Sequence, residues 1–468
     1  MFICAVHGSV YMYSQQLLQP NVIQYRRVGM WTPGDAPAHG EPGDGTASVE
    51  IDVRFLRPMV KAAGLVQLLF FHASDLPLLG TEEFADRGRI FCCTPELLSW
   101  GLTGCESVGR MIVRQPDELE QGTSARKWEI WLRDVPFAVN ESSSAVTAHV
   151  PIVQSGVHYL LFSSCEPRTG DVLISGQTAW LNPYGYLPGE LFPFLPFFAM
   201  MLVAYIIVTC VWLVLCIKHR PLLLPLQQYI GGVLLLGTFE TLIWYLDYRS
   251  FNAGGTRGVA PVVLGVFLST VKKVVSRLLV LAVCLGYGVV RPTLGSVAYK
   301  VLALGVVYLT FSAVVDVASN ISQMSEMSVS LRVFFILPIA LLDSFFYWWV
   351  FSGLNRTLSQ LSTRRQSAKL LLYRRFSHIL LISICISGIW VGWQLIVIIS
   401  DTLDSRWAYL WMFDAFWHLL YLGILLAVCC LWSPSKNNLQ YAYMDELGQS
   451  EEEEEEEADP ADEQHYKA

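Results

Sequence analysis

The amino-acid sequence predicts a membrane protein with three parts: an N-terminal β-sandwich, an all-α bundle of seven transmembrane helices and a disordered acidic C-terminal tail. Three observations lead to this fold class. The chain has 468 residues, of which 53% are hydrophobic and 15% charged, a composition that is unusual for a soluble protein of this size. Its long apolar runs all follow position 190, and a run of glutamates fills positions 451–457. The C-terminal half is therefore expected to have the lipid bilayer as its solvent.

The first element, residues 1–187, has the pattern of a water-soluble domain. Apolar residues alternate with polar ones around 49–55 and 128–132, and two further apolar stretches at 157–162 and 171–176 are separated by turn residues. Alternation of this kind is typical of half-buried strands, so we predict a small β-sandwich.

The start of this domain is predicted to be irregular. Residues 31–45 are crowded with Pro and Gly, and 1–20 lack the cationic start and apolar core of a signal peptide. We therefore expect 1–45 to be either irregular in structure or the product of a misannotated first exon.

Next come seven stretches long enough to cross about 30 Å of hydrocarbon, which takes roughly 20 helical residues. They lie at 191–217, 226–246, 259–290, 297–317, 333–351, 376–399 and 408–431, within a bundle that we assign to 191–432. From 433 to 468, Pro, Asn, Gln and Glu leave too little apolar surface to offset the entropy of ordering. This last segment is predicted to be a disordered tail.

The basic residues of the short loops predict the orientation. Lys and Arg are enriched on the cytoplasmic side of membrane proteins. One side of the predicted bundle carries Lys218, Arg220, Arg291, Arg356, Arg364, Arg365, Lys369, Arg374, Arg375 and Lys436, and the other only Arg249, Arg257, Arg332 and Arg406. The N-terminal domain is therefore expected in a lumenal or extracellular space and the tail in the cytosol.

Glycosylation acceptors and cysteines fit this orientation. Asn140 and Asn320 each begin an Asn-x-Ser motif on the predicted lumenal side. Disulfides persist in such a compartment, and the candidates there are Cys92, Cys93, Cys105 and Cys165. We expect one lumenal bridge, and the sequence leaves its pairing open.

Several motifs resemble a known family. The segment Asn-Pro-Tyr-Gly-Tyr-Leu-Pro-Gly-Glu-Leu at 182–191 is similar to the junction before the first helix in the GOLD-domain seven-transmembrane family, which includes the lung seven-transmembrane receptors and Wntless. Residues 271–273 and 285–292 resemble the third helix of the transmembrane protein 87 branch. Residues 414–418 and 431–438 resemble its seventh helix and the segment that follows.

The resemblance runs from about position 157 into the tail and carries functional implications. It implies a GOLD-like β-sandwich above the bundle, residence in the Golgi and a part in transport from endosomes to the Golgi. Members of the branch have also been proposed as cation channels or mechanically responsive proteins. The branch usually has an acidic residue in the third helix shortly before the basic pair, where this chain has Val266.

Ionisable residues inside the predicted helices are the candidate functional site. Such residues are costly in a bilayer, so they face the bundle interior, where they pair or line a wet cavity. The set comprises Glu240, Lys272, Lys273, Arg277, Asp316, Asp343, Asp414 and His418. One interpretation is structural ion pairs that fix helix register. The other is a polar cavity open toward the lumenal domain, in which the basic third helix favours anionic ligands such as phospholipid headgroups, and the acids favour cations or proton sensing.

The tail carries a candidate sorting signal. Residues 441–444 place Tyr441 three positions before Met444, a Tyr-x-x-apolar pattern that sorting adaptors bind, and the acidic run follows. The alternative is a solvated spacer that only keeps the tail extended.

Other functional classes lack their motifs. No Gly-x-Gly-Asp accompanies Asp316 or Asp343, and His219, His378 and His418 are too few and too scattered for a zinc hydrolase. The third helix lacks the acidic-Arg-aromatic triplet of rhodopsin-like receptors, and no basic patch suits nucleic acid. We therefore expect no catalysis, cofactor or metal.

The sequence-based expectation is a multi-pass Golgi membrane protein that acts in retrograde transport or Golgi homeostasis. One alternative is a cation channel, or a mechanically or pH-responsive ion-conducting protein, of the Golgi or plasma membrane. Another is an orphan seven-helix receptor or a protein that binds cargo or lipid. The expected partners are membrane lipids and, through the acidic tail, trafficking adaptors.

Overall fold

Alternating side chains build the N-terminal strands. In the computed structural model of the chain, strand β3 (Ser48–Leu56) buries Val49, Ile51 and Val53 while Glu50 and Asp52 between them stay exposed. Successive side chains of a strand point to opposite faces, so this pattern gives one face to a core and one to water. The structure describes residues 9–36, 46–58, 63–81, 89–114, 130–139, 141–287, 295–320, 329–363, 367–400 and 406–434.

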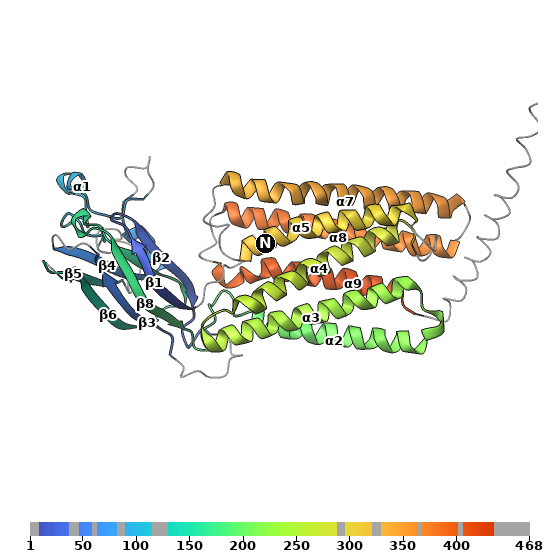
Figure 1. Ribbon diagram of the computed structural model, residues 1–468, viewed down its shortest axis with the longest axis horizontal. Helices are drawn as coiled ribbons and strands as arrows, with labels where there is room; N and C mark the ends of the chain where they lie inside the picture. The colour runs from blue at the N-terminus through green and yellow to red at the C-terminus, as the bar shows by residue number, and fades with distance from the viewer. Residues whose placement is uncertain are drawn as a thin grey trace, which may run out of the picture.

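Within these described ranges, eight strands form two antiparallel sheets (Figure 1). The sheet of order β1-β8-β3-β6 contains β1 (Val10–Leu18), β8 (Val172–Leu181), β3 and β6 (Ser143–Pro151). The sheet of order β2-β7-β4-β5 contains β2 (Ile23–Met30), β7 (Gly156–Ser163), β4 (Gly64–His72) and β5 (Trp131–Phe137). One apolar core with Trp180 fully buried lies between the sheets, so the predicted β-sandwich is confirmed.

The region 1–45 differs from the sequence prediction of irregular structure, because two of the eight strands lie in it. Strand β1 pairs with β8, with Val10 opposite Ala179, and β2 pairs with β7, with Ile23 opposite Ser163. The register of β1 shifts between Tyr13 and Gln16, which breaks its alternation. Since both partners are far away in sequence, local pattern did not reveal these strands.

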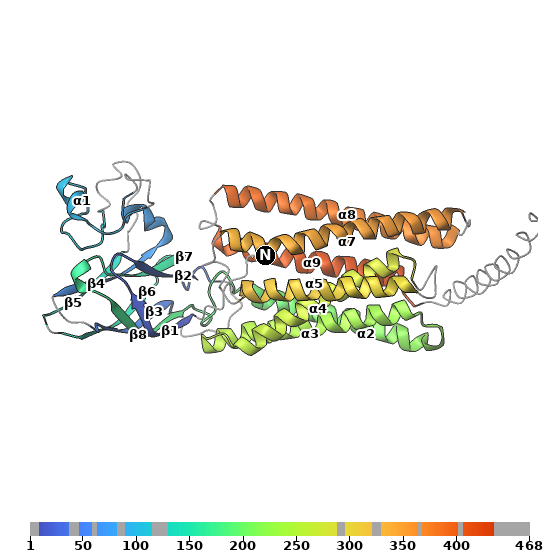
Figure 2. The same cartoon turned by 45° about the horizontal axis from the view of Figure 1, so that its top comes forward.

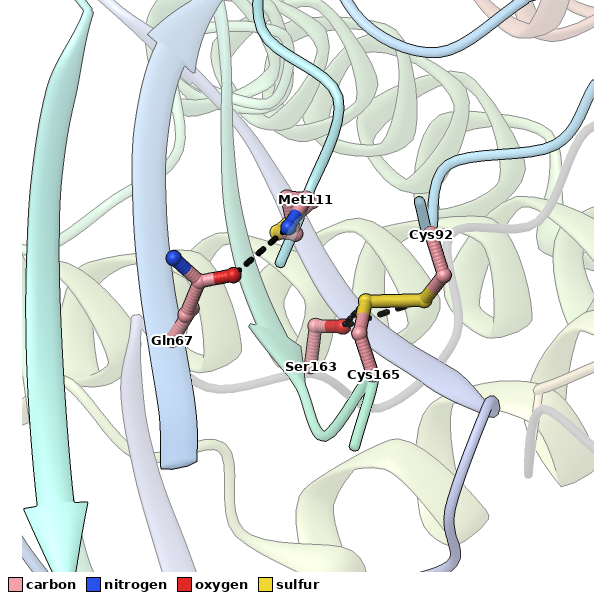
Figure 3. The surroundings of a disulfide bond; sticks show 5 residues. All are labelled: Gln67, Cys92, Met111, Ser163 and Cys165. Carbon is pink, nitrogen blue, oxygen red and sulfur yellow. Dashed lines mark hydrogen bonds between the residues drawn. A yellow bond between two sulfur atoms is a disulfide. The ribbon is translucent and has the colours of Figure 1, made fainter. Parts of the chain in front are cut away.

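A cross-linked segment covers the outer face of the second sheet. It contains the short helices η1 (Ala73–Leu78) and α1 (Pro95–Ser99), and its apolar side chains pack on Leu69 and Phe71 of β4, the alternate residues to those facing the sandwich core. Two disulfides fix it, Cys92–Cys165 (Figure 3) and Cys93–Cys105, where the sequence predicted one.

In the part of the C-terminal body that the structure describes, seven long helices run side by side away from the sandwich (Figures 1 and 2). They are α2 (Phe194–Lys218), α3 (Pro225–Gly254), α4 (Val259–Cys284), α5 (Ser296–Asn320), α7 (Val329–Thr363), α8 (Ser367–Ile399) and α9 (Trp411–Leu431). Six of the described helices are long and apolar enough to cross a membrane, and the seventh, α4, carries the basic residues 272, 273 and 277. This arrangement confirms the predicted fold class of a helical membrane bundle behind a sandwich.

Two asparagine side chains join the sandwich to the bundle. Asn182 accepts a hydrogen bond from the Trp31 N–H at 2.8 Å and donates one to the Leu187 carbonyl at 3.0 Å. Asn252, near the end of α3, accepts from the Leu187 N–H at 3.1 Å and donates to the Tyr184 carbonyl at 2.8 Å. The motif at 182–191 therefore connects the two bodies through hydrogen bonds to both.

The start of α9 also contacts the sandwich. Trp31 of the sandwich packs on Trp407 in η6 (Trp407–Tyr409), with ring centroids 4.7 Å apart. Glu190, just before α2, accepts a hydrogen bond from the Gly29 N–H at 2.9 Å. The sandwich thus holds the ends of α2, α3 and α9 that lie nearest to it.

Candidate functional site

A cavity of 860 Å³ lies within the bundle, between α2, α3, α4, α7, α8 and α9. Apolar side chains such as Phe194, Val233 and Leu425 supply much of its wall. Seven of the eight ionisable residues predicted from the sequence also line it, namely Glu240, Lys272, Lys273, Arg277, Asp343, Asp414 and His418. The cavity lining is more apolar than the predicted polar cavity, and the role of these seven residues stays a prediction.

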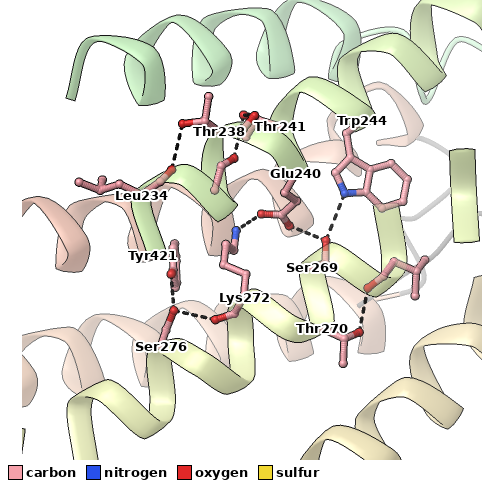
Figure 4. Close-up of polar contacts among 12 residues, drawn as sticks. Leu234, Thr238, Glu240, Thr241, Trp244, Ser269, Thr270, Lys272, Ser276 and Tyr421 are labelled. Carbon is pink, nitrogen blue, oxygen red and sulfur yellow. Dashed lines mark hydrogen bonds and ion pairs between the residues drawn. The ribbon is translucent and has the colours of Figure 1, made fainter. Parts of the chain in front are cut away.

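The most buried ion pair joins α3 to α4. The Lys272 ammonium contacts the Glu240 carboxylate, and the two side chains are 5% and 1% exposed (Figure 4). The Ser269 hydroxyl donates to the same carboxylate and accepts from the Trp244 indole N–H at 3.2 Å. The Lys272 ammonium also lies 4.4 Å from the centre of the Tyr421 ring. Each member of the pair is thus compensated by groups from neighbouring helices.

A second ion pair joins α4 to α7. Arg277 and Asp343 approach to 2.6 Å, with side chains 30% and 29% exposed, and the guanidinium lies 4.4 Å from the centre of the Tyr308 ring on α5. Residues 273 and 277 share one face of α4, as their spacing of four predicts, and both line the cavity. This face of α4 therefore places two cationic side chains on the cavity wall, and the second of them, Arg277, also contacts Asp343 and Tyr308.

The structure adds a third ion pair that sequence reasoning missed. Arg257, in the turn between α3 and α4, contacts Asp247 of α3 at 2.6 Å, and both side chains are almost fully buried. The Arg257 guanidinium also lies over the rings of Trp244 and Tyr248. The sequence did hold a signal for this pair, because Asp247 lies in an apolar helix and Arg257 follows in the next loop. Arg257 was used only to predict orientation.

Asp414 and His418 occupy the α9 side of the wall. The His418 ring packs against Phe197 and Phe198 of α2, with centroids 6.2 and 5.3 Å away. The sequence predicted a shared face for this pair, and both residues do line the cavity.

Some predicted residues lie outside what the structure describes. They are Asn140, Tyr441 and Met444, and the side chains of Asp316 and Asn320. The glycosylation and sorting assignments stay predictions. In the described ranges, no group of three or more His, Cys, Asp or Glu side chains is placed to hold a metal.

An antiparallel sandwich joined to a helical membrane bundle with an ion-paired cavity defines a class, multi-pass membrane proteins with a folded extramembranous domain. Comparison with known proteins then gives the family. Residues 193–439 match the family model described as "GOST, seven transmembrane domain", which covers more than half of the chain. The chain belongs to this family.

Curated relatives agree with the resemblance to the transmembrane protein 87 branch. The chain is 32% identical to transmembrane protein 87B of Mus musculus over 67% of this chain and 56% of the relative. It is 34% identical to transmembrane protein 87A of Homo sapiens over 58% of this chain and 48% of the relative. A yeast relative, membrane protein PTM1 of Saccharomyces cerevisiae, is 28% identical over 57% and 52%. The chain therefore spans about half the length of the curated relatives it matches.

Proposed function

We propose that this protein is a Golgi membrane protein that acts in endosome-to-Golgi transport or Golgi homeostasis, and that its bundle cavity binds a phospholipid. The Golgi role rests on the family resemblance. The lipid-binding role rests on the geometry of the cavity, and the observation that carries it is a large, mainly apolar space in the bundle with a basic helix on one wall.

The cavity has the properties of a site for an amphiphile. Ligand pockets of about 300–1,000 Å³ with apolar walls and a few placed polar groups are typical of small-molecule sites, and 860 Å³ falls in that range. Acyl chains would lie against the walls formed by Phe346, Leu380 and Leu425. The basic residues of α4 would attract the phosphate of a headgroup.

Lipid mass spectrometry of the purified protein tests this proposal. Wild-type protein in mild detergent should carry a bound phospholipid, and Lys273→Gln should lower the bound fraction because it removes a charge from the wall. Lys300→Gln, at an exposed position of α5, is the matched control and should leave binding unchanged. Equal lipid occupancy in the two variants, or no bound lipid in the wild type, would contradict the proposal.

Cation conduction is the second candidate, favoured by acids on the cavity wall within the bundle. Glu240 and Asp343 each contact a basic residue, so a permeating cation would have to compete with Lys272 or Arg277 for its ligand. This competition favours phospholipid binding over cation conduction as the role of the cavity. The test is cation flux into liposomes that contain the purified protein. A flux that Asp414→Asn abolishes would favour conduction over phospholipid binding, and the absence of flux would favour phospholipid binding.

The proposed orientation places the sandwich in the lumen and the tail in the cytosol. Two disulfides in the sandwich support it, because such bonds persist in oxidising compartments. Lys218 is the last residue of α2 and Arg220 lies in the turn that follows, at the end of α2 away from the sandwich in Figure 1. Basic residues on this side of the bundle are what the positive-inside rule expects of the cytosolic side.

The trafficking role is tested through the tail. Deletion of 441–457 should shift the steady-state location of the protein away from the Golgi if adaptors bind this segment. Tyr441→Ala should reproduce the shift, and Tyr466→Ala, outside the motif, is its control. An unchanged location of the deletion variant would remove the sorting role of the tail.

A further inference from the structure

Trp407, in η6 before α9, lies in a slot that two glycines leave open. Its side chain is 7% exposed. A Cβ atom added at Gly29 of β2 would lie 2.8 Å from the Trp407 ring, and one added at Gly189, before α2, would lie 2.6 Å from it. Real Cβ atoms do not approach other atoms so closely, so the ring keeps its place only while both positions are glycine.

The slot is built by the sandwich and by the segment that enters α2. The Gly189 N–H donates to the Gly29 carbonyl at 2.7 Å, and the Gly29 N–H donates to the Glu190 carboxylate at 2.9 Å. Trp31, just after β2, adds its ring to the slot, 4.7 Å from that of Trp407 between centroids. The position of the Trp407 ring is therefore set by backbone that the folded sandwich holds in place.

The turn that carries Trp407 continues directly into α9. The Leu410 N–H donates to the Trp407 carbonyl at 3.4 Å, and the Phe413 N–H donates to the Leu410 carbonyl at 3.1 Å, so hydrogen bonds bridge η6 and α9. Asp414 on the cavity wall follows Trp407 by about 10 Å of helical rise. A displacement of the Trp407 ring is therefore passed along one helical segment to the cavity.

The opposite end of α9 is held by the bundle itself. The Gln227 amide of α3 donates to the Trp432 carbonyl at 3.1 Å, and the Trp432 ring packs edge-on against Phe376 of α8, with centroids 5.1 Å apart. Between the two ends, His418 and Tyr421 line the cavity. Packed interiors compress little and transmit strain, so a shift at Trp407 tilts α9 about its fixed end and moves its cavity face.

We propose that Trp407 is a positioning residue through which the sandwich controls phospholipid binding in the bundle cavity. The proposal rests on the phospholipid-binding role proposed above. The sandwich holds α9 where its cavity face, which includes Asp414 and His418, fits the bound lipid. Coupling between two sites is reciprocal in free energy, so a bound lipid also stabilises the seat of Trp407 in the sandwich.

Lipid mass spectrometry of the full-length protein in mild detergent tests the coupling with variants outside the cavity lining. Gly29→Ala and Gly189→Ala press on the ring from two different segments, and Trp407→Ala removes it. Each should lower the amount of copurified phospholipid by about fivefold or more, the lower end of typical couplings between sites. Gly34→Ala is the matched control in the sandwich and should leave this amount unchanged, because a Cβ atom there would meet nothing within 4 Å.

A double variant separates an effect of Trp407 from one of Glu190, whose carboxylate lies 2.5 Å from the same added Cβ at Gly29. Gly29→Ala should cause no further loss of phospholipid when position 407 is already alanine, because the added methyl group no longer meets the ring. A further loss in the double variant would assign the effect to Glu190 and overturn the role of Trp407.

Hydrogen exchange followed by mass spectrometry separates positioning from a general loss of structure. In Gly29→Ala, amides of 411–421 should exchange faster than in the wild type, and amides of β3 and β8 should exchange at the wild-type rate. Faster exchange throughout the sandwich would show unfolding and overturn the proposal.

The two experiments also separate the coupling from the proposed function. If the wild type carries no phospholipid, the proposed function fails, and the exchange rates alone decide the coupling: an unchanged rate at 411–421 in Gly29→Ala would overturn it. If the wild type carries phospholipid and Gly29→Ala, Gly189→Ala and Trp407→Ala carry as much, phospholipid binding stands and the control by the sandwich is overturned.

Discussion

The sandwich and the bundle place their charged side chains on opposite sides: the sandwich on its surface and the bundle in its interior. In the sandwich, Glu50 and Asp52 face water while valine and isoleucine fill the core. In the bundle, Val211 and Val214 cover the outside, and Lys272 and Glu240 meet inside. The difference follows from the solvent: charge goes to the surface when water surrounds the domain, and to the interior when lipid does.

The comparison shows that the contribution of an ion pair to stability depends on its burial. Arg110 and Asp134 of the sandwich approach to 3.4 Å with side chains 49% and 34% exposed, so water screens them. The pair of Lys272 and Glu240 is shielded from water, and loss of one partner leaves a buried charge without compensation. Stability in the sandwich should depend instead on packing and on its disulfides.

The largest effect is expected for Lys272→Met. It leaves Glu240 buried without its cation, which should lower the free energy of unfolding of the bundle by about 3–5 kcal/mol. Unfolding of the protein in detergent, followed by tryptophan fluorescence, measures the loss. The double variant Lys272→Met, Glu240→Leu should recover most of it, because no charge then remains. Lys300→Met is the control, and an equal unfolding midpoint for it and Lys272→Met would refute the buried-pair argument.

Removal of the disulfide that closes the longer loop should destabilise the sandwich more, because the loop-closure entropy grows with the logarithm of loop length. Cys92–Cys165 closes a separation of 73 residues and Cys93–Cys105 one of 12. The chain-entropy model gives losses of about 4 kcal/mol for Cys92→Ser, Cys165→Ser and about 3 kcal/mol for Cys93→Ser, Cys105→Ser. Limited proteolysis of the sandwich in rising denaturant measures both. The reverse order would show that local packing outweighs loop closure.

Acid should weaken the sandwich through His158. Burial, with the nearby His72 adding to it, lowers the pKa of His158 to about 3. Its pKa in the unfolded chain is about 6.5, so the unfolded state binds the proton first as pH falls. Stability is therefore complete above about pH 6.5 and declines between 6.5 and 3, by about 2 kcal/mol from pH 7 to pH 5.

Denaturation of the protein at a series of pH values tests this window. His158→Gln should flatten the decline, whereas His149→Gln, on the exposed face of β6, should leave its slope unchanged. A slope that persists in His158→Gln would assign the acid sensitivity to another group.

The smallest effect is expected for Arg110→Gln. This change breaks the exposed pair with Asp134 and should cost less than about 1 kcal/mol, because both groups are hydrated in either state. The same denaturation assay measures it. A loss as large as that of Lys272→Met would erase the distinction between the two bodies.

The sequence by itself determined the class of the protein and named seven ionisable residues that line the cavity. Apolar length located the helices, with the first predicted at 191–217 and observed at Phe194–Lys218. Seven ionisable residues in apolar helices were expected to face the interior, and they line the cavity. A charged side chain in such a helix is costly in lipid whichever helices pack around it, so the sequence of the helix is enough to predict this.

Only the tertiary structure decided which residues meet. It paired Lys272 with Glu240 and Arg257 with Asp247, joined Cys92 to Cys165, and placed β1 beside β8. Periodicity and transfer free energy are properties of a local stretch of chain. A contact also depends on the distance and angle between elements far apart in sequence, and these are fixed only when the elements pack.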